Sequence, residues 1–199
     1  MPSLVVGGEA LPVLHVSQIA AALGLPVAAR HESARLASDA AVLLEAWLGH
    51  LRELGWDMLT KPTPSRDRSL RNLTVNVFHP FELLPAAWQT GHFDWDPDGD
   101  IEREGRLTGA GELLAFAERA ASGWHGFLLE VGPDLERRDP RVRSPRGDLP
   151  YSTLLDAQRW HAAFHYRQLV TFLGAEGAPP RRVLPLVRFA GLDLPRDVF

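Results

Sequence analysis

The sequence predicts a mainly α-helical fold: a four-helix bundle with long crossover connections and a small N-terminal ββα appendage. Apolar residues recur at steps of three and four in four segments of roughly 20 residues each, and Pro and Gly residues cluster between these segments. With 199 residues the chain has room for one domain with an appendage. Four amphipathic helices in one domain are typical of a bundle.

The N-terminal segment, residues 1–27, predicts the appendage. Residues 3–6 and 11–16 are rich in Val and Leu and flank a Gly-Gly turn, which is typical of two short strands. Residues 17–24 predict a helical turn that ends at a Gly. The same turn resembles the first part of a helix-turn-helix, but no basic recognition helix follows, so a DNA-binding regulator is the least favoured function.

The first two bundle helices are predicted from continuous apolar stripes. One stripe covers residues 32–54 and is followed by Gly55, which ends the helix. The other covers residues 68–88 and contains Pro80. Because proline lacks an amide hydrogen and disfavours α geometry at the preceding residue, we expect this helix to kink or restart at Pro80.

The third and fourth helices complete the predicted bundle, which extends over residues 28–177. The third stripe covers residues 108–132, and the fourth covers residues 152–173. The links before the third and fourth helices are long, so we expect crossovers. The tail, residues 178–199, is too rich in Pro for a helix, and we expect it to pack on the bundle as an extended segment.

The composition excludes several kinds of chemistry. The absence of Cys rules out disulfides, thiolate-bound zinc, iron–sulfur clusters and a Cys nucleophile, so a metal site must use nitrogen and oxygen ligands, and eight His are present. A net charge of −4 argues against nucleic acid as a partner. Because the sequence has no long apolar run and no signal-peptide pattern, we expect a cytoplasmic protein without a membrane partner.

The pair His161 and His165 is the most informative motif. Residues four apart lie about 40° apart around a helix and about 6 Å along it, so both imidazoles can reach one ion. Both lie on the apolar stripe, where a shared cation would offset the cost of burying them. The alternative is that both are core-edge histidines bonded to carbonyls. His79 is the best third ligand, although it could instead cap the carbonyls that Pro80 leaves without a partner.

Residues 70–88, with His79, and residues 160–169, with His161 and His165, resemble the DinB/YfiT-like metalloenzymes, in which one His of the second helix precedes a His-x-x-x-His motif in the fourth. The resemblance implies a four-helix bundle that holds one divalent ion (zinc, nickel, iron or manganese) on these three His. It also implies a metal-dependent transferase or isomerase that uses a small thiol such as bacillithiol, mycothiol or glutathione. Since the chain has no Cys, that thiol would be exogenous.

We therefore expect a metal-binding protein that acts on a small-molecule substrate, either as a thiol-dependent transferase or isomerase or as a hydrolase that uses metal-bound water. Glu82, one turn from His79, is the candidate catalytic residue, as a base or as a group that orients a His; the alternative is a solvated Glu at a helix end. The competing function is a non-catalytic bundle that binds metal or a partner. A homodimer is a further expectation.

Two charged segments match known patterns only in part. Residues 94–101 match the first eight positions of a calcium loop, but Gly105 stands where a bidentate Glu is required, so we expect an acidic, solvated crossover. Residues 133–150 carry five Arg and four acidic residues. We expect a mobile charged loop there; the alternative is that its Arg side chains clamp the carboxylates of a thiol cofactor.

Overall fold

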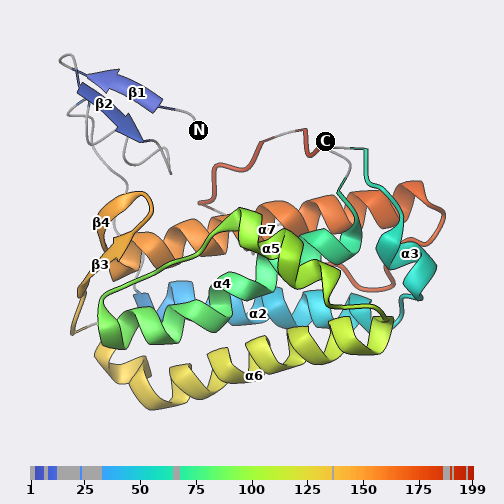
Figure 1. Ribbon diagram of the computed structural model, residues 1–199, viewed down its shortest axis with the longest axis horizontal. Coiled ribbons are helices and arrows are strands. Elements are labelled where there is room, and N and C mark those ends of the chain that lie inside the picture. Colours follow the sequence, from blue (N-terminus) through green and yellow to red (C-terminus); the bar gives the residue numbers. More distant parts are fainter. Residues whose placement is uncertain are drawn as a thin grey trace.

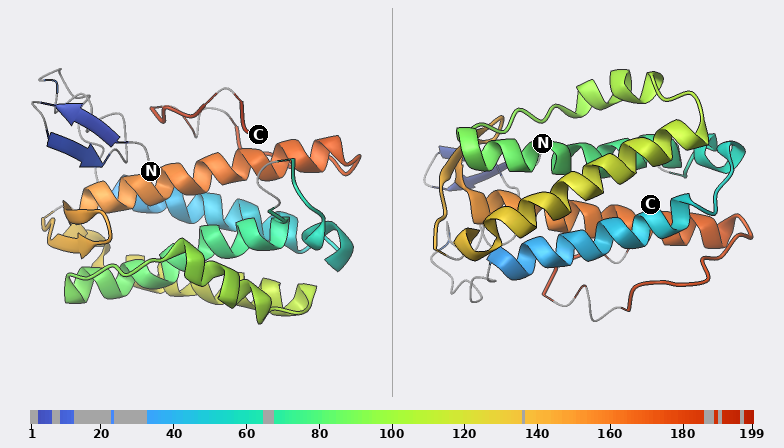
Figure 2. Two further views of the ribbon diagram at one scale, coloured as in Figure 1. Left: turned by 45° about the horizontal axis from the view of Figure 1, so that its top comes forward. Right: turned by 90° about the horizontal axis from the view of Figure 1, so that it is seen from below.

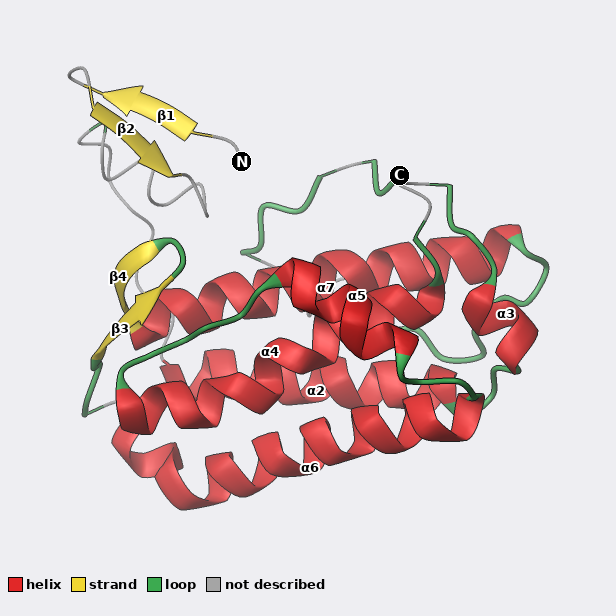
Figure 3. Cartoon of the chain, in the orientation of Figure 1, coloured by secondary structure: helices red, strands yellow, loops and turns green. Residues whose placement is uncertain are grey.

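The computed structural model describes residues 3–6, 9–12, 23, 33–64, 68–135, 137–185, 189, 191–195 and 197–199. Over these residues the fold is mainly helical, as the sequence predicts (Figure 3). The helices are α2 (Ser33–Leu51), α3 (Trp56–Thr60), α4 (Leu70–Thr90), α5 (Pro97–Gly105), α6 (Ala110–Leu135) and α7 (Tyr151–Ala175), and the strands are β1 (Ser3–Val6), β2 (Glu9–Pro12), β3 (Arg141–Ser144) and β4 (Gly147–Pro150).

The four long helices α2, α4, α6 and α7 form the bundle (Figures 1 and 2). Helix α2 packs on α6 and α7, and α4 packs on the same two helices. The order around the core is therefore α2, α6, α4, α7, which places α2 diagonally across from α4 and α6 diagonally across from α7. Of the two predicted crossovers, the link from α6 to α7 joins diagonal partners and crosses the bundle, whereas the long link from α4 to α6 joins two neighbouring helices. The link from α2 to α4 also joins diagonal partners, which the sequence did not predict.

The centre of the bundle is aromatic, and its two buried indole N–H groups are hydrogen-bonded. Trp47 and Trp124 are buried, and their indole N–H groups donate to Thr74 Oγ1 at 3.1 Å and to the Ala37 carbonyl at 3.2 Å. The Trp124 ring meets Phe81 edge to face with the ring centroids 5.3 Å apart. Buried aromatic rings with bonded N–H groups supply much of the burial that holds such a domain together.

Helix α4 continues through Pro80, so the predicted restart at that residue is wrong. The helix begins at the cap Ser69 and ends at Gly91, which has a φ of 73°. Pro80 has no amide hydrogen for the carbonyl of Asn76. All side chains from residue 74 to residue 81 are buried, and this packing on both sides of the proline outweighs the lost hydrogen bond.

Residues 133–150 do not form the predicted mobile loop, because a β-hairpin occupies most of the segment. Strands β3 and β4 pair antiparallel, with Val142 of β3 completely buried. The Arg143 carbonyl accepts from the Phe93 N–H, and the Arg143 N–H donates to the Gly91 carbonyl, both at 2.8 Å. The hairpin is thus fixed by one apolar anchor and by backbone bonds that charge counting does not reveal.

Residues 94–101 also differ from the expected solvated crossover. Asp96 caps the N-terminus of α5, where its Oδ1 accepts from the Asp98 N–H at 3.0 Å. Trp95 is buried and Asp100 is only 1% exposed. The segment forms a capped helix, with one of its carboxylates inside the protein.

The C-terminal tail follows α7. The hydroxyl of Tyr166 accepts from the Leu184 N–H at 3.2 Å, and the Trp160 indole N–H donates to the Asp193 carbonyl at 3.1 Å. The Arg167 guanidinium donates to the Pro195 carbonyl. These contacts between side chains and backbone fix the path of the tail.

At the N-terminal end, β1 and β2 pair antiparallel, with Ser3 opposite Pro12 and Val6 opposite Glu9. The predicted helical turn at residues 17–24 lies outside the described residues. None of the helices within the described ranges is both long enough and apolar enough to span a bilayer.

Candidate metal centre

His161 and His165 meet at one point on the inner side of α7. Their Nε2 atoms are 3.1 Å apart, and the ring centroids are 4.5 Å apart. Two nitrogen ligands about 2.1 Å from one ion, at angles between octahedral and tetrahedral, lie about 3.0–3.4 Å apart. The structure therefore brings these two predicted ligands together at the spacing of ligands that share an ion.

The hydrogen-bond partners of His165 determine its tautomer. Its Nδ1 is 2.6 Å from Gln168 Oε1, and the Gln168 amide nitrogen donates to the Val198 carbonyl, which identifies Oε1 as the acceptor. In the neutral ring Nδ1 thus carries the hydrogen and Nε2 carries the lone pair. A buried group that accepts from the other ring nitrogen is the usual support of a metal-binding His.

Asn76 of α4 supplies a third atom to the same point. Its Nδ2 donates to Asp100 Oδ2 at 2.9 Å, so the side-chain oxygen is the atom that lies 2.9 Å from His161 Nε2. The nitrogen of His161 therefore faces two acceptors, the Asn76 oxygen and the lone pair of His165, with at most one hydrogen to offer. A cation at this point would satisfy all three atoms.

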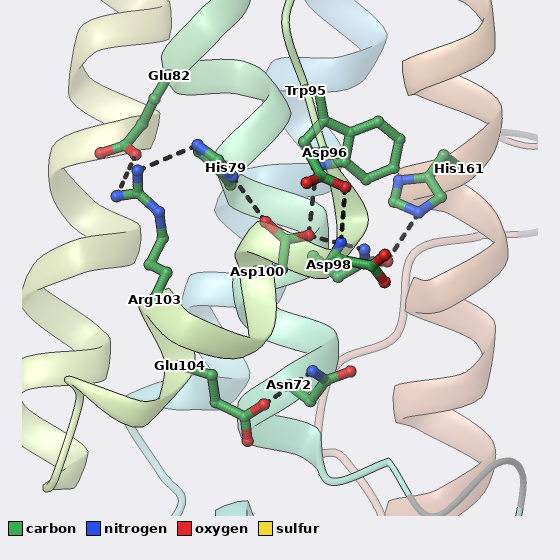
Figure 4. Close-up of polar contacts among 11 residues, drawn as sticks. Asn72, His79, Glu82, Trp95, Asp96, Asp98, Asp100, Arg103, Glu104 and His161 are labelled. Carbon is green, nitrogen blue, oxygen red and sulfur yellow. Dashed lines mark hydrogen bonds and ion pairs between the residues drawn. The ribbon is translucent and has the colours of Figure 1, made fainter. Parts of the chain in front are cut away.

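His161 is held in its neutral form. Burial lowers the pKa of its imidazole well below the ordinary value of 6.5, and Coulombic interactions with His165 and Arg146 lower the pKa further. Its Nδ1 is buried with no hydrogen-bond partner among the described residues. The Trp95 ring lies edge-on to the imidazole, with the centroids 5.2 Å apart (Figure 4). A neutral imidazole in an enclosed position is the form that binds metal ions.

His79, the third predicted ligand, does not join this pair. Its Nδ1 donates to Asp100 Oδ1 at 2.6 Å, and its Nε2 accepts from the Arg103 guanidinium at 3.1 Å (Figure 4). Arginine can only donate, so the lone pair that would bind an ion is already occupied. Because Asn76 precedes His79 by almost one helical turn, Asn76 is the residue of α4 at the level of His161.

Glu82, the candidate catalytic residue, contacts Arg103 rather than a histidine. Its Oε2 accepts from Arg103 Nη1 at 3.2 Å (Figure 4). The Arg103 guanidinium also lies 5.7 Å from the centroid of the Phe116 ring. Glu82 therefore fixes the cation that covers His79, and it makes no direct contact with His161 or His165 in the hydrogen bonds of the described residues.

Asp100 is the residue that sequence reasoning misjudged most. Its two oxygens accept from three buried donors, namely His79 Nδ1, Asn76 Nδ2 and, at 3.2 Å, Trp95 Nε1. It thereby orients the amide of Asn76 toward His161. The sequence did contain a signal: an Asp-Pro-Asp helix start next to a Trp is typical of a capped helix with a buried side, whereas a solvated loop rarely holds a Trp.

Among the residues that the structure describes, no group of three or more His, Cys, Asp or Glu side chains is arranged to hold an ion. The convergent set consists of two imidazoles and one amide oxygen, and such nitrogen and oxygen donors suit zinc, nickel, iron or manganese. Two electrostatic effects oppose each other there. The charges of Arg146 and Arg68 near His161 disfavour a cation, whereas the Asp100 carboxylate behind Asn76 favours one.

Fold and site together define a helical bundle with an internal polar centre built from α4, α5 and α7. In comparisons with protein-family models, with curated proteins and with solved structures, no match to this chain was found.

Proposed function

We propose that the chain is a divalent-metal-binding bundle protein similar to the DinB/YfiT-like metalloenzymes, with His161 and His165 as ligands and the Asn76 oxygen in the third position. The observation that supports the proposal most directly is the meeting of the three atoms, with Nε2 to Nε2 at 3.1 Å and Nε2 to the amide oxygen at 2.9 Å. The proposal replaces His79 of the expected three-His set, because Arg103 occupies the lone pair of that residue.

A divalent ion bound there would act as a Lewis acid toward a thiol or water. The chain's own residues would prepare the site for it. Gln168 fixes the His165 tautomer, Asp100 turns the oxygen of Asn76 toward His161, and the Trp95 ring shields the imidazole from water. Each of these residues acts through a ligand, so we assign them positioning roles.

The charges around the centre favour an anionic reactant. The positive charges of Arg146 and Arg68 near His161 attract an anion to the side of the ion. A thiol that reacts as its thiolate suits this field, and with no Cys in the chain the thiol must be a small molecule. We therefore propose transfer of an exogenous thiol to an electrophile, in the cytoplasm, as the activity.

Metal content tests the binding part of the proposal. Protein purified without chelators should contain about one divalent ion per chain by elemental analysis. His161→Ala and His165→Ala should remove the ion, and Asn76→Ala should reduce occupancy. His79→Ala should retain it, and His125→Ala serves as a surface control. A wild-type protein without metal but with an intact helical fold would overturn the proposal, and loss of metal in His79→Ala would restore the three-His set.

Turnover tests the catalytic part separately. The metal-loaded protein should consume an electrophile such as chlorodinitrobenzene in the presence of bacillithiol, mycothiol or glutathione, faster than free thiol alone. His161→Ala should reduce the rate to that of the free thiol. Full metal loading with no turnover for any thiol would leave a metal-binding protein and contradict thiol transfer.

A further inference from the structure

The bundle also holds a cavity of about 810 Å³. The side chains of α2 line one side of it, α6 and the C-terminal tail line the others, and Tyr166 of α7 also contributes to the lining. None of the lining residues belongs to the metal centre. Small-molecule sites in proteins typically enclose roughly 300–1,000 Å³, so this cavity has the size of such a site.

The lining of the cavity is mostly apolar because α2 presents small residues there. Ala41, Ala46 and Gly49 lie on this side of the helix, and Leu128 of α6 and Leu184 of the tail line the cavity from other sides. A Cβ atom added at Gly49 would meet no atom within 4 Å. The space therefore results from absent side chains and offers an apolar surface to a ligand.

Tyr166 and His50 form an uncharged polar pair in this lining. The Leu184 N–H donates to the Tyr166 hydroxyl at 3.2 Å, and this hydroxyl is hydrogen-bonded to His50 Nε2 at 3.0 Å. Burial lowers the pKa of His50, so its imidazole is neutral at pH 7. The pair adds hydrogen-bonding capacity without a charge that would repel an apolar ligand.

The charged residues of the lining are divided between two parts of the chain. Glu45 belongs to α2 and Glu53 to the turn that follows it, whereas Arg181 and Arg182 belong to the tail. Glu45 Oε1 lies 3.8 Å from His125 Nδ1. Arg181 and Arg182 form no ion pair with any other residue in the described part of the chain. Two exposed guanidinium groups beside an apolar cavity suit a carboxylate or sulfonate.

We propose that this cavity binds an amphipathic small molecule whose apolar body lies against α2 and whose single anionic group pairs with Arg181 and Arg182. Glu45 of α2 and Glu53 just after this helix orient the ligand, because they repel its anionic end toward the tail. The site is independent of the metal centre.

Two fluorescent probes separate the apolar and the anionic contributions. Anilinonaphthalene sulfonate combines an aromatic body with one anionic group, and phenylnaphthylamine is the corresponding neutral compound. Both should bind the folded wild-type protein at one saturable site. Gly49→Trp should weaken both probes more than tenfold, because the indole fills the cavity. Near-UV circular dichroism of each variant confirms that the protein is folded.

Matched control variants test where the probes bind and which residues contact the anionic group. Gly123→Trp on α6 adds the same side chain outside the cavity, where a Cβ also meets no atom within 4 Å, and should bind like the wild type. The double variant Arg181→Ala/Arg182→Ala should weaken the sulfonate about fivefold, as expected for exposed ion pairs, and leave the neutral probe unchanged. His161→Ala should leave the affinities of both probes unchanged.

Three results would overturn the proposal. Equal binding by Gly49→Trp and Gly123→Trp would show that the probes bind elsewhere. Equal weakening of both probes in the double Arg variant would contradict the anionic group. Loss of binding in a folded His161→Ala variant would show that the probes bind at the metal centre.

Discussion

His79 and His161 belong to one polar network, but the nitrogens of their imidazole rings differ in how many hydrogen-bond partners they have. Both nitrogens of His79 have partners, which are the Asp100 carboxylate and the Arg103 guanidinium. The Nε2 of His161 faces two acceptors, and its Nδ1 has no partner within the described residues. The difference shows that α5, which carries both Asp100 and Arg103, determines which histidine remains able to bind a cation.

Removing Asp100 should have the largest effect on stability, because Asp100 is one of the two partners of His79. Asp100→Ala leaves three buried donors without an acceptor, and we expect a loss of about 3 kcal/mol in the free energy of unfolding. Urea denaturation measures it. Glu102→Ala changes an exposed carboxylate of the same helix and should cost less than about 0.5 kcal/mol. Similar stabilities of these two variants would contradict the structural role of Asp100.

Replacing Gln168 should weaken metal binding by the pair His161 and His165. Gln168→Leu removes the acceptor that fixes the His165 tautomer, so metal affinity should fall about 10–100-fold, as measured by competition with a chromogenic chelator. The matched control is Gln158→Leu. The Oε1 atom of Gln158 is buried without a partner among the described residues, so this variant should keep its metal affinity and lose no stability. Unchanged metal affinity in Gln168→Leu would remove Gln168 from the site.

Replacing Arg103 tests how firmly the lone pair of His79 is occupied. Arg103 and Glu82 are partly exposed, with side-chain exposures of 39% and 27%, so solvent screens their interaction. Arg103→Met should therefore cost about 1 kcal/mol or less in thermal or urea unfolding. The metal content should not change. If Arg103→Met bound a second ion, His79 would prove to be a ligand that Arg103 had blocked.

A third histidine, His50, provides a reference outside the network, and its effect should be the smallest. Burial lowers its pKa below the ordinary value of 6.5, and the charge of Glu53 opposes that shift only in part. Below pH 6.5 the unfolded chain therefore takes up a proton that the folded chain does not. This contribution to stability is complete above pH 6.5 and is lost as the pH falls toward the folded-state pKa.

The measurement is the free energy of unfolding of the wild type and of His50→Asn between about pH 8 and pH 5. The wild type should lose more stability than the variant on acidification. An equal loss in both proteins would mean that His50 does not contribute to the pH dependence.

The four long helices could be predicted from the sequence because their apolar stripes recur at helical spacing, and the meeting of His161 with His165 follows from the same spacing. The alignment of α4 and α7 along their axes could not be predicted from the sequence. Choosing between Asn76 and His79 requires knowing how two helices far apart in the sequence are aligned along their axes, and that alignment is set by side-chain packing across the core.

Asp100 was missed for a related reason. A carboxylate is buried only where several donors meet it, and here the donors come from α4 and from Trp95, outside its own helix. The run of Asp residues, which resembles part of a calcium loop, indicates a charged and solvated segment. The tertiary contacts that bury one of them are not encoded in that local pattern.

The bonds between α7 and the C-terminal tail have a consequence for how the sequence can evolve. Trp160, Arg167 and Gln168 all donate to backbone carbonyls of the tail, at residues 193, 195 and 198. Every residue type carries such a carbonyl, so the tail can change its side chains at these positions while the helix cannot. Substitutions on the two sides would then be uncorrelated, and coevolution statistics would overlook a contact that reaches the metal centre through Gln168.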